Sequence, residues 1–356
     1  MATEPHLPFV SRDVRPTVGE LTEALRPPRR FAEMSFDDYV PSAAFPSQAE
    51  AKERTVAFAR SLVDASRSRA EARWRRRPQS VKGSGLYLDG GFGVGKTHLA
   101  VSLYYMAQVP KAYAAFADLT AYVGAIGFER ALNELGQRRL LVIDEFELDD
   151  PGDTVLIAHL CQRLVEQGLS IAATSNTLPD RLGRGRFAAD DFLREIQGLA
   201  DSFEIVRMEG PDYRHRDLDL SEVEGVDEQL LNDLGTRGQL EVVSFDELLR
   251  VLRRQHPSRY RSLLGGVAGV GLRGVKTFGD QSDALRFVSF IDRIYEEEIA
   301  FIYAGVTLDD LFPEAFRRGG FSMKYGRALS RIAGMLSEFR TLGLDGHAEG
   351  DAESPQ

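Results

Sequence analysis

The stretch Gly90-Gly91-Phe92-Gly93-Val94-Gly95-Lys96-Thr97 fits the pattern G-x-x-x-x-G-K-[ST] of a phosphate-binding loop. Residues 86–88 before it are typical of a short buried strand, and residues 98–106 after it have apolar side chains at helical spacing. A glycine-rich turn that carries Gly-Lys-Thr by chance is the alternative, but it does not account for this flanking strand and helix. Glycines let successive backbone N–H groups point at phosphate oxygens, and the helix start adds the positive end of its dipole.

We therefore predict a nucleoside triphosphate site, in which Lys96 contacts the β- and γ-phosphates and the Thr97 hydroxyl binds Mg²⁺. The residues expected around the phosphates are Gly90, Gly91, Phe92, Gly93, Val94, Gly95, Lys96, Thr97 and His98.

Two carboxylates, Asp144 and Glu145, follow the apolar run at 140–143, which is typical of a strand covered on both faces. Ligands of open α/β sheets bind beside the carboxyl ends of the strands. We expect Asp144 to contribute to the Mg²⁺ shell and Glu145 to polarise the attacking water. An acidic strand-to-loop junction without such a role is the alternative, although the separation from Lys96 leaves room for one helix–strand–helix passage.

Asn176 stands at the end of the next predicted strand, residues 170–175. An uncharged polar side chain there would reach the γ-phosphate or the lytic water. Asparagine also commonly begins a turn, which is the alternative interpretation.

The alternation of predicted strands and helices indicates an α/β fold with a parallel five-stranded sheet flanked by helices. We expect this core to span residues 31–217, after a disordered arm at 1–30, with Ser47 capping a long helix. Residues 218–341 should be mainly helical, with the clearest helices at 284–303 and 324–339, and residues 342–356 should form a disordered tail. The strands are expected at 86–88, 111–116, 140–143, 170–175 and 205–208.

Composition limits the class of protein. Hydrophobic residues make up 43% of the 356 residues, which is enough for a substantial core. The single cysteine, Cys161, excludes an internal disulfide and suits a reducing cytoplasm. We find no apolar run of membrane-spanning length and no signal-peptide core. The net charge of −10 argues against a polycationic nucleic-acid binder, although it allows a local basic patch.

One such patch is the arginine-rich stretch at 67–77 around Trp74. It would suit an acidic partner, a nucleic-acid backbone or an anionic membrane surface. A solvated helix face with Trp74 in the core is the simpler alternative.

Several segments together resemble the ZapE-type cell-division ATPases, which belong to the AAA+ class and are close to the mitochondrial AFG-type ATPases. The resemblance extends over about residues 31–340, and the segments after the ATPase motifs make it specific. The matching segments are residues 85–97, 141–146 and 173–176, Asp212-Tyr-Arg-His-Arg216, Pro46-Ser-Gln48, residues 285–295 and residues 325–331.

The resemblance implies an AAA+ core with a mostly helical C-terminal lid region, ATP and Mg²⁺ as ligands, and a nucleotide-dependent, hexameric ring. By position, Lys96 and Thr97 serve phosphate and Mg²⁺, Asp144 and Glu145 form the hydrolytic pair, and Asn176 senses the γ-phosphate. It also implies action on FtsZ polymers in the cytoplasm, whereas the mitochondrial branch is linked to membrane-protein quality control.

The arginines are less well defined. The family carries a finger arginine before a Phe-Leu pair, and this chain has alanine at that position within residues 185–193. Arg186 and Arg194 are the nearby candidates. Arg214 and Arg216 either approach the phosphates or clamp the sheet, and Arg327 and Arg331 are candidates for a lid arginine or are surface charges.

The sequence therefore predicts an ATPase that remodels a protein assembly. A nucleic-acid-associated loader or helicase accessory is the second hypothesis, and the arginine-rich stretch is the feature that favours it. A small-molecule phosphoryl transferase is the third, but no acceptor pocket is evident.

Overall fold

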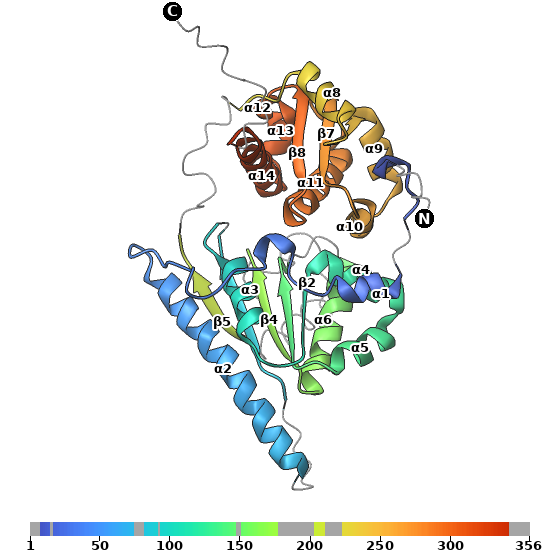
Figure 1. Cartoon of the computed structure of the whole chain (residues 1–356). Coiled ribbons are helices and arrows are strands. Elements are labelled where there is room, and N and C mark those ends of the chain that lie inside the picture. The colour runs from blue at the N-terminus through green and yellow to red at the C-terminus, as the bar shows by residue number, and fades with distance from the viewer. Residues whose placement is uncertain are drawn as a thin grey trace, which may run out of the picture. The chain divides into compact units, whose positions relative to one another are not determined.

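The structure is a computed structural model, and it describes residues 8–14, 17–74, 82–91, 93–146, 151–176, 203–210 and 223–341 (Figure 1). The chain forms two compact units. One unit is Thr17–Arg214, and the other combines Met1–Pro16 with His215–Gln356.

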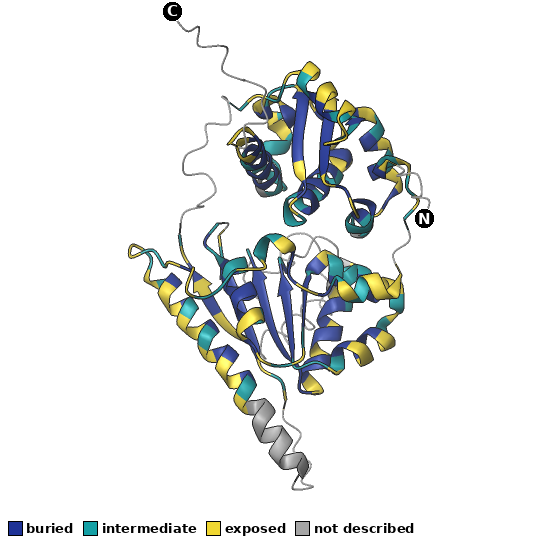
Figure 2. Ribbon diagram, viewed as in Figure 1, coloured by how far each residue is buried: buried dark blue, intermediate teal, exposed yellow. Residues whose placement is uncertain are grey.

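The unit Thr17–Arg214 contains the predicted parallel five-stranded sheet, in the order β2-β3-β4-β1-β5. All four strand pairs are parallel, and β3 and β4 are buried along their whole length, as Figure 2 shows. Burial on both faces explains their continuous apolar runs. The strands are β1 (Gly85–Gly90), β2 (Lys111–Ala115), β3 (Leu140–Asp144), β4 (Ser170–Ser175) and β5 (Phe203–Met208).

Helices cover both faces of this sheet because side chains alternate along each strand. On one face Leu86, Leu88 and Val142 belong to a core cluster with residues of α3 and α2. On the other face Leu141 and Ile143 pack in a cluster with residues of α4, α5 and α6. The helices are α2 (Pro46–Trp74), α3 (Lys96–Met106), α4 (Phe116–Ile126), α5 (Phe128–Gly136) and α6 (Pro151–Glu166).

The N-terminal segment corrects one prediction. We expected a disordered arm at 1–30, but the described part of it forms η1 (Phe9–Ser11), α1 (Val18–Glu23) and η2 (Arg29–Phe31). Phe9 is fully buried in the core of the C-terminal unit (Met1–Pro16 with His215–Gln356), and Leu25 is buried in the core of the unit Thr17–Arg214. The unit that contains the five-stranded sheet thus begins at Thr17 rather than at residue 31. The expected tail at 342–356 lies outside the described residues.

The C-terminal unit was predicted to be mainly helical, but it also contains a second parallel sheet. Its strand order is β6 (Glu241–Ser244), β7 (Gly269–Val275) and β8 (Ala300–Gly305). The predicted helix at 284–303 ends at Glu296 as α11, and β8 begins at Ala300. Glu298 has a φ of 57°, a left-handed conformation that a continuous helix excludes. The predicted helix at 324–339 is confirmed within α14.

The elements of this unit are α8 (Glu228–Thr236), β6 (Glu241–Ser244), α9 (Phe245–Arg254), η6 (Pro257–Arg259), α10 (Tyr260–Leu263), β7 (Gly269–Val275), α11 (Gln281–Glu296), β8 (Ala300–Gly305), α12 (Leu308–Leu311), α13 (Glu314–Arg317) and α14 (Ser322–Thr341). Among the described helices of both units, none combines the length and apolarity needed to cross a bilayer.

Candidate nucleotide site

The predicted phosphate loop connects the last residue of β1, Gly90, to the first residue of α3, Lys96. Gly93 and Gly95 have φ angles of 70° and 93°, in the left-handed region that glycine tolerates best. The loop therefore turns sharply onto the N-terminus of α3. Phe92 lies outside the described residues.

Lys96 is buried at the start of this helix, and its ammonium group is held by oxygen acceptors of the loop and of the segment after β4. Its Nζ donates to the carbonyl oxygens of Gly90 (2.7 Å) and Gly91 and to Asn176 Oδ1 (2.9 Å). The predicted cation and the predicted strand-end asparagine are thus neighbours in space, although β4 lies far along the chain. This arrangement places one positive charge and one amide at the loop.

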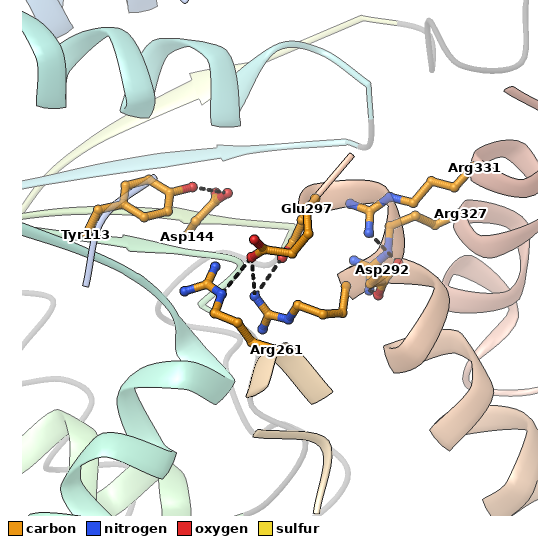
Figure 3. Close-up of polar contacts among 9 residues, drawn as sticks. Tyr113, Asp144, Arg261, Asp292, Glu297, Arg327 and Arg331 are labelled. Atoms are coloured by element: carbon orange, nitrogen blue, oxygen red, sulfur yellow. Dashed lines mark hydrogen bonds and ion pairs between the residues drawn. The ribbon is translucent and has the colours of Figure 1, made fainter. Parts of the chain in front are cut away.

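Asp144, at the end of β3, faces the same helix start. Its Oδ1 accepts hydrogen bonds from Thr97 Oγ1 at 3.2 Å and from Thr174 Oγ1 at 2.5 Å. Its Oδ2 accepts one from Tyr113 OH at 2.7 Å, the contact drawn in Figure 3. A hydroxyl and a carboxylate side by side are the hard oxygen ligands that Mg²⁺ prefers. The two predicted metal ligands therefore fit a shared cation.

Burial raises the pKa of Asp144, and the neighbouring Glu145 carboxylate raises it further, whereas the Thr174, Tyr113 and Thr97 hydroxyl groups oppose this rise. An ionised carboxylate in such a site requires donors or a cation nearby. The three hydroxyl donors meet part of that requirement.

Glu145 follows directly and has a φ of 52°, which is uncommon for a residue with a side chain. Its N–H donates to Thr174 Oγ1 at 3.0 Å, and the N–H of Phe146 donates to the Thr174 carbonyl oxygen at 2.7 Å. Such strained conformations cost of order 1–3 kcal/mol and concentrate at functional sites. Thr174 thus anchors the turn that carries the predicted catalytic glutamate.

The segment before α2 braces the phosphate loop. Tyr39 OH donates to the Val94 carbonyl oxygen at 3.1 Å, and the His98 Nε2 lies 2.8 Å from the Ser35 carbonyl oxygen. A Cβ atom at Gly95 would lie only 2.4 Å from the Tyr39 ring. His98, expected near the phosphates, therefore uses its side chain to hold this N-terminal segment, with the Tyr39 ring at its edge.

Ser47 does not cap α2 as predicted, because the helix already begins at Pro46. Its Oγ accepts a hydrogen bond from the N–H of Glu209 at 2.9 Å, and Gln48 Nε2 donates to the Glu209 carbonyl oxygen at 2.9 Å. The Pro46-Ser-Gln48 segment thus fastens the start of α2 to the chain that follows β5.

Arg327 and Arg331, the candidate lid arginines, are both buried and contact one carboxylate within the C-terminal unit. Arg327 Nη2 donates to Asp292 Oδ2 at 2.7 Å, and Arg331 Nη1 donates to Asp292 Oδ1 (Figure 3). Asp292 lies on α11 and the arginines lie on α14, so two of the segments that carried the family resemblance are ion-paired to each other. The alternative that these arginines are surface charges is wrong.

The remaining arginine candidates lie outside the described residues. Arg186, Arg194, Arg214 and Arg216 fall in segments that the structure does not describe, as do the side chains of the arginine-rich stretch at 67–77. Their expected roles stay predictions.

Sequence reasoning missed Tyr113, Thr174 and Asp89 as parts of this site. Asp89 is buried near the end of β1, 3.6 Å from Arg207 Nε, and burial raises its pKa even though Arg207 opposes this. The signal in the sequence that could have indicated these residues is a polar group within an otherwise apolar, buried strand, because a buried polar group needs a hydrogen-bond partner.

The chain is similar to known proteins along most of its length. The family model described as AFG1-like ATPase matches residues 16–230 and 221–341. The cell division protein ZapE of Escherichia coli (strain K12) is 25% identical over 302 residues, which cover 71% of this chain and 78% of that protein.

Solved structures with a similar core include that of DnaI, at 17% identity and a TM-score of 0.41, which covers 54% of this chain and 98% of that one. The AMPPCP-bound DnaA of Aquifex aeolicus has 13% identity and a TM-score of 0.35, covering 88% of this chain and 92% of that one. The family match spans both compact units and includes the loop, Asp144 and Glu145, and on this basis the chain belongs to the AFG1-like ATPase family.

Proposed function

We propose that this ATPase binds Mg²⁺ with ATP, works as a ring of identical subunits, six by resemblance, and uses hydrolysis to remodel a protein assembly. The observation that carries the proposal is the convergence of Lys96, Thr97, Asp144 and Asn176 at one end of the sheet. These groups come from three strand ends, and a triphosphate with its cation accounts for all of them.

The chemistry follows from their placement. Glu145 would orient and polarise a water for in-line attack on the γ-phosphorus, and Lys96 would balance the charge on the β- and γ-phosphate oxygens. Thr97 and Asp144 would hold Mg²⁺, which would supply further positive charge against the phosphates. Asn176, already bonded to Lys96, is placed to report the presence of the γ-phosphate.

An arginine from the neighbouring subunit would complete the charge balance, with Arg186 and Arg194 as the candidates. On the resemblance to the ZapE-type ATPases, we propose the cytoplasm as the location and FtsZ polymers as the partner. The name of the relative, a cell division protein, is consistent with a role in division. The net charge of −10 argues against nucleic acid as the main partner, and peripheral contact with a membrane through the arginine-rich stretch is compatible with the proposal.

The variant Glu145→Gln tests this function. It should bind ATP as the wild type does but hydrolyse it about 100-fold more slowly or worse, which is the usual contribution of a general base. The slow complex should accumulate as a ring, detectable by light scattering with ATP. Glu129→Gln, an exposed change on α5, is the matched control and should behave as wild type.

Sedimentation of FtsZ polymers with the Glu145→Gln protein, with and without ATP, tests the partner. We expect the Glu145→Gln protein to sediment with FtsZ polymers only when ATP is present. Wild-type hydrolysis by Glu145→Gln would contradict the catalytic role, whereas nucleotide-dependent assembly without FtsZ retention would contradict the partner alone.

A further inference from the structure

Tyr113 lies on β2, beside the strand that carries the cation carboxylate. It pairs in register with Val142, so Asp144 lies one diagonal step further along β3 on the same face of the sheet. Neighbouring strands lie about 4.8 Å apart and each residue advances about 3.3 Å along a strand, so a long aromatic side chain can span this step. The tyrosine hydroxyl spans this step and donates to Asp144 Oδ2 at 2.7 Å, as Figure 3 shows.

The Tyr113 ring is itself fixed. It is almost fully buried, and it packs edge-on against the ring of Tyr104 at a centroid distance of 6.1 Å. Tyr104 belongs to α3, the helix whose first turn contains Lys96 and Thr97. The hydroxyl is therefore held by the same helix and sheet that form the nucleotide site.

The two carboxylate oxygens of Asp144 are divided among the donors. Oδ1 accepts from Thr97 and Thr174, whereas Oδ2 accepts from Tyr113. A carboxylate can rotate about its last side-chain bond, and donors on both oxygens restrict that rotation.

We infer that Tyr113 is a positioning residue for the cation site, because its hydroxyl holds Asp144 Oδ2 so that Oδ1 stays turned toward Thr97. Tyr113 does not touch the cation itself. This inference rests on the Mg²⁺–ATP site proposed above, and it adds a specific role for a residue of the neighbouring strand.

The test is the variant Tyr113→Phe, which keeps the ring and removes one oxygen. Binding of a fluorescent ATP analogue is titrated with Mg²⁺ and is also measured in EDTA. Partners that orient a metal ligand typically contribute 10- to 100-fold in metal affinity. We expect the half-saturating Mg²⁺ concentration to rise at least about 10-fold by this measure, with the affinity in EDTA unchanged.

Tyr122→Phe is the matched control, because Tyr122 is equally buried but belongs to the core on the opposite face of the sheet. It should leave the Mg²⁺ titration unchanged. In an Asp144→Asn background, Tyr113→Phe should have no further effect on the titration, because the carboxylate through which it acts is gone.

An unchanged Mg²⁺ titration for Tyr113→Phe would overturn the inference, as would an equal loss of affinity in EDTA, which would indicate a structural role. If the wild type showed no Mg²⁺-dependent binding, the proposed site would fail instead, so the two failures are distinguishable.

Discussion

Lys96 and Asp144 are buried at one site, and their side chains need opposite kinds of hydrogen-bond partner. Lys96 is buried among oxygen acceptors, and Asp144 is buried among hydroxyl donors. Buried charges are tolerated only when they are paired or hydrogen-bonded. Both residues therefore have fixed positions before any ligand binds, which lowers the cost of ordering them around a triphosphate.

At this scale we predict that Lys96→Ala lowers ATP affinity about 10- to 100-fold, because one charge-assisted contact contributes roughly 1.5–3 kcal/mol. Equilibrium binding of a fluorescent nucleotide measures the loss. Lys82→Ala, an exposed lysine just before β1, should bind as wild type. Equal affinities for Lys96→Ala and wild type would remove Lys96 from the phosphate site.

At the scale of elements, the phosphate loop depends on a segment far before it. Gly95 combines a φ of 93° with close contact to the Tyr39 ring, so it is constrained both by conformation and by space. The Ser35–His98 contact fixes the same segment to the first turn of α3.

We predict that Gly95→Ala destabilises the ATPase unit, Thr17–Arg214, by at least about 1–2 kcal/mol, which is the cost of the left-handed conformation alone. The added Cβ should also displace Tyr39. The temperature of thermal unfolding and the affinity for nucleotide should both fall. Gly124→Ala in α4 is the control, because a Cβ there meets no atom within 4 Å. A Gly95→Ala protein as stable as the control would contradict this reading of the loop.

The pairing of α11 with α14 depends on Asp292. Burial alone would raise the pKa of Asp292, but the guanidinium groups of Arg327 and Arg331 lower it. The folded state therefore binds fewer protons than the unfolded state, so the stability from this cluster is complete above the usual aspartate pKa of about 3.9 and is lost as the pH falls through the lower folded pKa.

We predict that Asp292→Asn lowers the free energy of unfolding of the C-terminal unit by about 3–5 kcal/mol near neutral pH, the cost of breaking a buried pair. The difference between variant and wild type should stay constant down to about pH 4 and shrink below it, when denaturant unfolding is repeated between about pH 6 and pH 2. Asp309→Asn, which removes the more exposed pair with Arg317, should cost at most about 1 kcal/mol. A pH-independent difference for Asp292→Asn would show that the charge is not its cause.

At the scale of the whole molecule, the N-terminal segment contributes to both compact units. Phe9 stacks on Phe290 with ring centroids 6.0 Å apart, and its N–H donates to Glu241 Oε2 at 2.8 Å. Leu25 belongs to the core of the ATPase unit, where its carbonyl oxygen accepts from the N–H of Tyr113 at 3.1 Å.

We predict that Phe9→Ala destabilises the C-terminal unit by about 3–5 kcal/mol, as expected for a buried aromatic side chain, and leaves the ATPase unit unaffected. Hydrogen exchange should accelerate in β7 and α11 but not in β1 or β3. Val18→Ala, an exposed change in the same segment, should leave both units protected as in wild type. Unchanged exchange in β7 would contradict a structural role for Phe9.

The sequence by itself determined the phosphate loop, the acidic pair, the strand-end asparagine and the five strands of the first sheet. Each of these features is predicted by a contiguous sequence pattern that reflects local geometry. The patterns are glycines at the turn, apolar runs in buried strands, and carboxylates where a strand ends. Tertiary structure alone decided that residues 300–305 form β8, that Phe9 and Leu25 enter two cores, and that Tyr113 and Thr174 hold Asp144. A short apolar run suits a strand or a buried helix equally, and a lone tyrosine or phenylalanine acquires its partner only when distant segments pack together.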